Sequence, residues 1–162
     1  MTYEIAGLLA NISLALSLIV ALVFGTFQVR VAARDRRERL TLEVLRNFQT
    51  REFAELIARL NYYKVPSSYA ELLRLPIEEQ SKFIQFAQEM ETLGMLVAEK
   101  YINIDLVDKT LGSFVTTSWQ KYKKTFVEIR EQQPDPFLGE YFQWLAELME
   151  DRMNKHPRKS FS

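Results

Sequence analysis

The segment from Ile5 to Val29 is predominantly hydrophobic and contains no charged residue. As an α-helix, this segment of about 25 residues is roughly 37 Å long at about 1.5 Å per residue. The apolar core of a bilayer is about 30 Å thick, so the segment predicts a transmembrane helix that spans with some tilt. A signal peptide would begin with positive residues and carry a shorter apolar core, whereas this chain begins Met1-Thr2-Tyr3-Glu4.

Positive charge begins where the apolar segment ends, and only Glu4 lies on its other side. Positive flanks of a transmembrane helix stay in the cytoplasm, which predicts an N-terminus outside the cell and a cytoplasmic remainder. We expect the location to be the inner (plasma) membrane. The cluster is a topology signal and can also hold anionic lipid head groups. It consists of Arg30, Arg34, Arg36, Arg37 and Arg39.

Small residues recur every four positions inside the apolar segment, at Ser13, Ser17, Ala21 and Gly25. This spacing places them on one helix face. Small faces let two membrane helices approach closely, so this small-residue face predicts helix–helix association. Membrane helices are also generally rich in Ala, Ser and Gly, which is the alternative explanation of the pattern.

After Arg30 the hydrophobic positions keep helical spacing, and no segment alternates long enough to predict a strand. Caps and breakers divide this part into helices: one over 30–48, one capped by Thr50, one capped by Ser68, one from Pro76 to a stop at Gly94, one from a cap at Asp105 to a stop at Gly112, one over 113–132, and one from Asp135-Pro136 to about 153. In the last helix, Phe137, Tyr141, Leu145, Leu148 and Met149 are expected to face inward.

The predicted fold class is therefore all-α, with an N-terminal transmembrane helix continuing into a cytoplasmic multi-helix bundle. The expected domains are an anchor over 1–29, a juxtamembrane helix over 30–48, a helical domain over 49–153, and a disordered tail over 154–162. A domain of this length can bury a thin hydrophobic core.

Several short motifs of the cytoplasmic part resemble the bacterial family catalogued as domain of unknown function 4760. The resemblance covers most of the chain and rests on Leu93-Gly94, Ile104-Asp105, Leu111-Gly112, Trp119, Arg130, Phe142 and Trp144-Leu145. It implies a small protein with one N-terminal membrane helix and a cytoplasmic helical domain. The matching motifs are helix stops, caps and core aromatics, so the resemblance implies a fold and no particular reaction.

The composition leaves little material for catalysis. The chain has no cysteine, a single histidine and no formal net charge, which disfavours thiol chemistry, zinc sites and bulk binding of nucleic acid. Arg152 and His156 resemble a pair used by some helical ribonucleases, but a basic tail is the simpler interpretation. The stretch from Trp119 to Phe126 mixes aromatics with lysines, and a buried face with a solvated rim explains it better than stacking on a nucleic acid.

We therefore expect no enzymatic activity, no cofactor and no metal. The predicted function is that of a membrane-anchored protein-interaction or scaffold module. Its expected partners are the lipid bilayer and either a second copy of the chain or an unknown cytoplasmic protein. The alternative is an oligomerising membrane effector in stress or phage defence.

Overall fold

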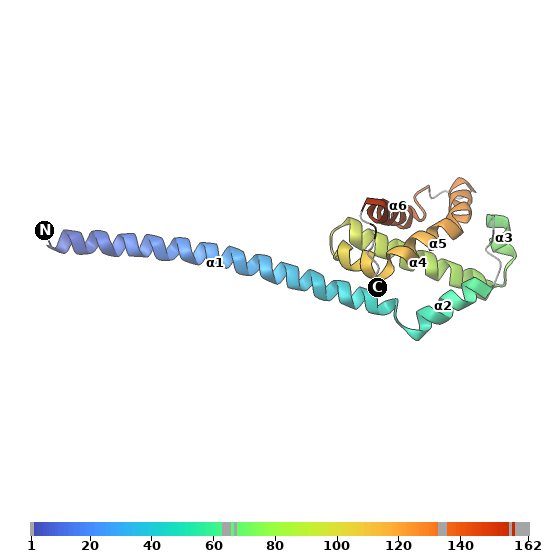
Figure 1. Cartoon of the computed structure of the whole chain (residues 1–162), viewed down its shortest axis with the longest axis horizontal. Coiled ribbons are helices and arrows are strands. Elements are labelled where there is room, and N and C mark those ends of the chain that lie inside the picture. The colour runs from blue at the N-terminus through green and yellow to red at the C-terminus, as the bar shows by residue number, and fades with distance from the viewer. Residues whose placement is uncertain (1, 63–65, 67, 133–135, 156, 158–162) are drawn as a thin grey trace. The chain divides into compact units, whose positions relative to one another are not determined.

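The computed structural model of the chain describes residues 2–62, 66, 68–132, 136–155 and 157, and it contains no strand among them. The all-α fold class is therefore confirmed (Figure 1). The helices are α1 (Thr2–Asn47), α2 (Arg51–Tyr62), α3 (Tyr69–Arg74), α4 (Ile77–Ala98), α5 (Ile104–Gln132) and α6 (Glu140–Lys155).

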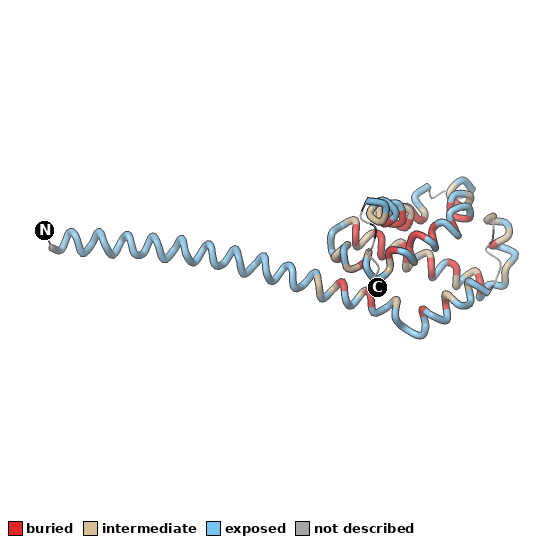
Figure 2. Tube along the Cα trace, viewed as in Figure 1, coloured by how far each residue is buried: buried red, intermediate tan, exposed pale blue. Residues whose placement is uncertain are grey.

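The chain divides into two compact units, Met1–Arg39 and Leu40–Ser162. The first unit contains most of α1, which is long and apolar enough to cross a membrane and has no buried residue in its apolar window. Figure 2 shows the apolar part of α1 exposed throughout. The predicted helical continuation beyond Arg30 is confirmed, because α1 runs to Asn47. Residues 40–47 belong to the second, C-terminal unit.

The two caps predicted for α2 and α3 are present. Thr50 Oγ1 accepts a hydrogen bond from the N–H of Phe53 at 3.1 Å, and Ser68 Oγ accepts one from the N–H of Glu71 at 3.0 Å. Each bond satisfies a backbone donor that the first turn of a helix would leave unpaired.

Gly94 and Gly112 were predicted to end helices, and both predictions are wrong. Gly94 lies inside α4, and Gly112 lies buried inside α5. A glycine ends a helix by adopting a left-handed backbone, but Gly139 is the only described glycine with a positive φ. Gly94 serves close packing instead, because a Cβ there would lie 2.3 Å from the carbonyl oxygen of Tyr141 in α6.

The start of α5 also differs from the prediction. The cap is Asn103, whose Oδ1 accepts from the N–H of Asp105 at 2.8 Å, so Asp105 lies within the first turn. The prediction failed because both residue types are good caps, and the earlier of them takes the role.

The last helix begins later than predicted. Asp135 lies outside the described residues, and α6 begins at Glu140 after a turn in which Gly139 has φ of 72°. The prediction of the buried face is confirmed at Leu145 and Met149 and is wrong near the start of the helix. Phe142, Leu145, Ala146 and Met149 are buried, whereas Phe137 and Tyr141, predicted to face inward, are 65% and 37% exposed.

The core of the C-terminal unit lies where α4, α5 and α6 pack together. Its centre is aromatic, with Phe86 and Phe142 fully buried and their ring centroids 5.8 Å apart in an edge-to-face contact. Trp119 of α5 packs edge-to-face on Phe142 with a centroid distance of 5.2 Å. Such pairs contribute about 0.5–1.5 kcal/mol each beyond the area they bury.

Candidate functional site

The small-residue face lies wholly within the exposed part of α1. Ser17 Oγ donates to the backbone carbonyl of Ser13 at 2.8 Å. This bond satisfies the hydroxyl within the helix and holds it close to the backbone. A Cβ added at Gly25 would meet no atom within 4 Å, so the face has room for another helix. Association through this face stays a prediction.

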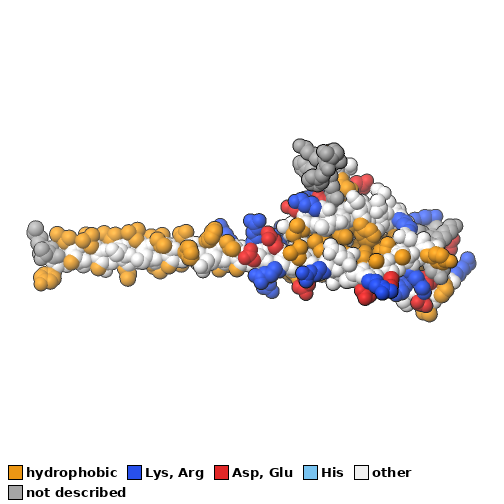
Figure 3. Space-filling view, turned by 60° about the horizontal axis from the view of Figure 1, so that its bottom comes forward, with side chains coloured by type: hydrophobic (Ala, Val, Ile, Leu, Met, Phe, Trp, Pro, Cys, Tyr) orange, Lys and Arg blue, Asp and Glu red, His pale blue; other side chains and the backbone are white. Residues whose placement is uncertain are grey.

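The five arginines after the apolar segment, called here the arginine collar, are all exposed. In Figure 3, hydrophobic side chains follow α1 and charged side chains gather toward its C-terminal part. Within the collar, Arg34 Nε donates to Glu38 Oε1 at 3.0 Å as an i, i+4 pair. Both side chains are solvated, so this pair contributes only about 0.3–0.5 kcal/mol to the helix.

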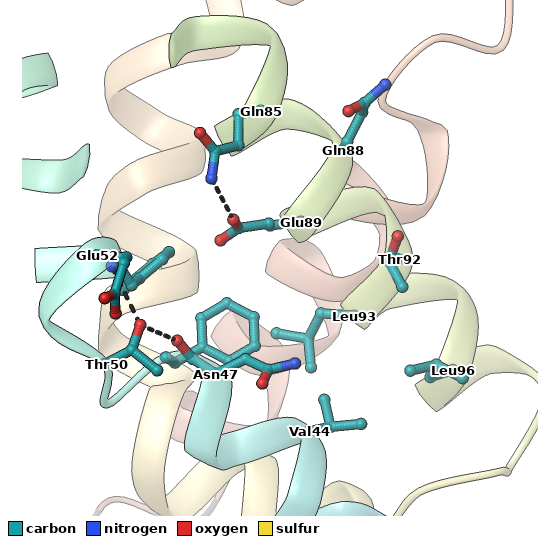
Figure 4. A pocket seen from close by; sticks show the side chains of 12 residues that line it. Val44, Asn47, Thr50, Glu52, Gln85, Gln88, Glu89, Thr92, Leu93 and Leu96 are labelled. Atoms are coloured by element: carbon teal, nitrogen blue, oxygen red, sulfur yellow. Dashed lines mark hydrogen bonds between the residues drawn. The ribbon is translucent and has the colours of Figure 1, made fainter.

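A cleft of about 500 Å³ opens in the C-terminal unit between residues 44–53 and α4. We call it the polar cleft. In Figure 4, Thr50 and Glu52 lie on one side of it and Gln85 and Glu89 on the other, above apolar side chains. Glu89 accepts a hydrogen bond from Gln85 Nε2 at 3.1 Å. The lining residues are Val44, Asn47, Phe48, Thr50, Glu52, Phe53, Gln85, Gln88, Glu89, Thr92, Leu93 and Leu96.

The polar cleft presents amides, hydroxyls and two carboxylates, which can form hydrogen bonds. Nothing in this lining supplies a thiol, an imidazole or an amine. Among the described residues, no group of three or more His, Cys, Asp and Glu side chains could hold a metal ion.

A second depression, the apolar groove, has a volume of about 430 Å³ and lies between α3, α4, α5 and the turn at 136–139. Ile84 stands at its surface and is 51% exposed, while Phe83 and Phe126 below it are buried. Figure 3 likewise shows hydrophobic side chains reaching the surface of the C-terminal unit. Exposed apolar surface of this kind marks contact sites when it is contiguous.

Ion pairs within the unit occupy several acidic residues that the sequence left unassigned. Arg59 donates to Glu78 Oε1 at 2.9 Å and to the buried Glu79 at 3.2 Å. Arg152 binds Asp105 and lies 3.2 Å from Asp108 Oδ2.

Arg152 therefore already has carboxylate partners within the C-terminal unit. Burial opposes its charge, but the hydrogen bonds and charges of Asp108 and Asp105 outweigh burial and raise its pKa. An arginine held in this way cross-links α6 to α5. The other half of the ribonuclease-like pair, His156, lies outside the described residues.

The mixed aromatic and lysine stretch of α5 has the predicted buried face. Trp119, Tyr122 and Phe126 are buried, and Lys121 and Lys124 are exposed. Burial raises the pKa of Tyr122 to about 12 and lowers the pKa of Lys121. Because the rings are enclosed by the core, they are not available to stack on bases.

Two links between elements could not be found from sequence. Glu91 of α4 accepts from the N–H groups of Tyr141 at 3.2 Å and Phe142 at 3.0 Å, so it caps α6 from another helix. Arg130 donates to the carbonyl of Leu138 at 2.5 Å and to Gln143 Oε1 at 2.7 Å. These partners are separated by many residues, and no local pattern signals such bonds.

Several residues that carry the family resemblance stabilise the C-terminal unit by packing or hydrogen bonding. Gly94 permits the close approach of α4 and α6, and Arg130 stacks over the ring of Trp119 at 5.8 Å while tying down the turn before α6. Phe142 and Leu145 are fully buried. These motifs therefore maintain the packing of the C-terminal unit.

The chain was compared with curated proteins, solved structures and family models. No curated protein and no solved structure matches the chain. One family model, described as domain of unknown function (DUF4760), matches residues 12–149 and so includes both the apolar helix and the bundle. The chain belongs to the DUF4760 family.

Proposed function

We propose that this protein is a single-pass protein of the inner (plasma) membrane whose helical C-terminal unit binds another protein in the cytoplasm. The observation that carries the proposal is the contrast between the two units. The apolar window of α1 is entirely exposed, while the C-terminal unit has its own closed core.

The exposed apolar surface of α1 supports the membrane location. Leu18, Val20 and Phe24, for example, are 60–65% exposed. Hiding a side chain of this kind from water stabilises a protein by about 1.5–3 kcal/mol. Summed along the apolar segment, the cost of leaving it in water exceeds the total stability of an ordinary domain. A bilayer removes this cost.

The orientation follows from the arginine collar, since positively charged flanks remain on the cytoplasmic side. Because the chain has no cysteine, single cysteines can report the position of each end. We expect Tyr3→Cys to react with a membrane-impermeant maleimide in spheroplasts. Glu150→Cys should react only after lysis, and the opposite pattern would contradict the proposed topology.

The binding role is supported by two surfaces of the C-terminal unit, the polar cleft and the apolar groove. A polar cleft with an apolar floor and a neighbouring apolar groove suit a polypeptide, which presents backbone amides and hydrophobic side chains together. A membrane anchor raises the concentration of such a partner near the domain by tethering. We also propose that the protein acts by binding and not by catalysis.

Crosslinking of the full-length protein in native membranes, followed by mass spectrometry, tests this proposal. A recurrent crosslink from the C-terminal unit to one cytoplasmic protein is expected. Ile84→Glu places a charge on the apolar groove and should weaken that crosslink. Ile77→Glu, on the same helix outside the groove and 77% exposed, is the matched control and should leave the crosslink unchanged.

The same experiment distinguishes the alternative, an oligomerising membrane effector. Ser17→Leu/Gly25→Leu makes the small-residue face bulky, whereas Ile19→Leu/Val23→Leu alters the opposite side of the helix. Self-crosslinks that only the first variant abolishes would favour the effector function. The absence of crosslinks of either kind would overturn both functions.

A further inference from the structure

The arginine collar is unusual in the kind of positive charge it carries. Residues 1–63 contain eight arginines and no lysine, and five of the eight lie within residues 30–39. Fixing membrane orientation requires positive charge, which lysine and arginine supply equally. The guanidinium group offers something further, because its planar fork matches two oxygens of a phosphate.

The collar also begins at the depth of the lipid phosphates if α1 spans the membrane. Its first member, Arg30, follows the uncharged segment directly, and the ten residues of the collar rise roughly 14 Å along the helix. At about 100° per residue, the five side chains are spread around α1, apart from one sector of about 140° that holds none of them. Lipids surround a single helix on every side, so this distribution suits them.

Charge inside the collar is only partly neutralised. Five arginines oppose Asp35 and Glu38, which leaves a net charge of +3. Arg34 is paired with Glu38, and Arg37 has another interaction within the chain. For Arg30, Arg36 and Arg39 the structure gives no hydrogen bond or ion pair to the residues it describes, and all three are exposed.

We propose that Arg30, Arg36 and Arg39 bind the phosphate groups of anionic phospholipids, so that the collar selects the lipids around the anchor. This inference rests on the proposed function, because only a membrane-spanning α1 places the collar among head groups. Free phosphate is a less suitable ligand, since a bilayer presents many phosphates at a fixed depth around the helix. Each arginine near an anionic surface changes affinity by about fivefold.

The test uses the full-length protein in nanodiscs that contain equal amounts of phosphatidylglycerol and phosphatidylcholine. Native mass spectrometry then counts the lipids that stay bound to the protein when it is released from the nanodisc. A nanodisc encloses no compartment and both of its faces are accessible, so loss of the arginines cannot affect the result by changing the orientation of the protein. Wild type should retain phosphatidylglycerol preferentially, and Arg30→Gln/Arg36→Gln/Arg39→Gln should retain the two lipids about equally.

Two further variants make the result specific. Arg46→Gln/Arg51→Gln/Arg74→Gln removes the same charge from exposed sites of the C-terminal unit, and it should keep the wild-type preference. Arg30→Lys/Arg36→Lys/Arg39→Lys keeps the charge without the planar fork and should show an intermediate preference. A lysine variant equal to wild type would overturn the role of the guanidinium.

Failure of the lipid inference can be told apart from failure of the proposed anchor. An Ala21→Cys variant carrying a fluorophore should be quenched by lipids with brominated tails, which reports insertion. Quenching without any lipid preference, or a preference lost equally in the control variant, would overturn lipid binding by the collar. Absence of quenching would overturn the membrane-spanning anchor, and the inference with it.

Discussion

Gly94 is the position where the smallest change should have the largest effect on the C-terminal unit. A methyl group added there would lie 2.3 Å from the carbonyl oxygen and 2.6 Å from the carbonyl carbon of Tyr141. Ordinary van der Waals contact begins near 3.4 Å, so α6 would have to move by about 1 Å. The obstacle is backbone, and no side-chain rotation relieves it.

The cost of Gly94→Ala follows from what that movement breaks. Overpacking of a core costs about 1–3 kcal/mol. The bonds from Glu91 to the N–H groups of Tyr141 and Phe142 would lengthen from 3.2 and 3.0 Å, and a bond to a charged group contributes about 1.5–3 kcal/mol. The higher helix propensity of alanine offsets about 1 kcal/mol of this destabilisation. We expect a net loss of about 2–4 kcal/mol in the free energy of unfolding.

Urea denaturation of the full-length protein in detergent micelles measures this loss, with the combined fluorescence of Trp119 and Trp144 as the signal. Gly25→Ala is the matched control, because its new methyl group meets no atom within 4 Å and lies outside the C-terminal unit. A free energy of unfolding within about 0.5 kcal/mol of wild type for Gly94→Ala would refute the close contact of α4 and α6.

Three further predictions use the same denaturation assay. Glu91→Gln removes the charge that caps α6 and should lower the free energy of unfolding by about 1–2 kcal/mol; an unchanged value would contradict the cap. The pKa of Tyr122 is about 12 in the folded protein and about 10 in the unfolded chain. Its stabilising effect on the fold, about 3 kcal/mol, is therefore complete below pH 10 and lost as the pH rises to 12. Tyr122→Phe should lack that part of the pH dependence, and equal slopes for both proteins would disprove it. Thr50→Ala should cost about 1 kcal/mol, and no change would show that the Thr50 hydroxyl does not cap α2.

The sequence was sufficient wherever the determining contact was local. Thr50 and Ser68 bond to N–H groups three residues away, and a pattern that short is visible in any window. The apolar run of α1 is equally self-contained. The buried face of the stretch from Trp119 to Phe126 followed from helical spacing, because a helix turns a single side toward the core.

Sequence reasoning failed where a residue serves a distant element. A glycine within a helical pattern is consistent with a stop or with close packing, and only the position of α6 decides between them at Gly94. The prediction that Phe137 faces inward was wrong because the turn at Gly139 places Phe137 before the start of α6. The polar cleft and apolar groove join residues from several helices, so no linear spacing predicts them.

The position of α6 in the chain has a consequence for biosynthesis. Ribosomes make α1 first, so the apolar helix is available to the membrane before most of the C-terminal unit exists. The core of that unit needs Phe142, Leu145 and Met149 of α6, the last helix to emerge among those described. Until then, Phe86 and Trp119 lack one of their aromatic neighbours, Phe142. The unit therefore completes its folding on a chain whose apolar helix has already been synthesised, and an interrupted translation would leave the apolar side chains of the unfinished core exposed.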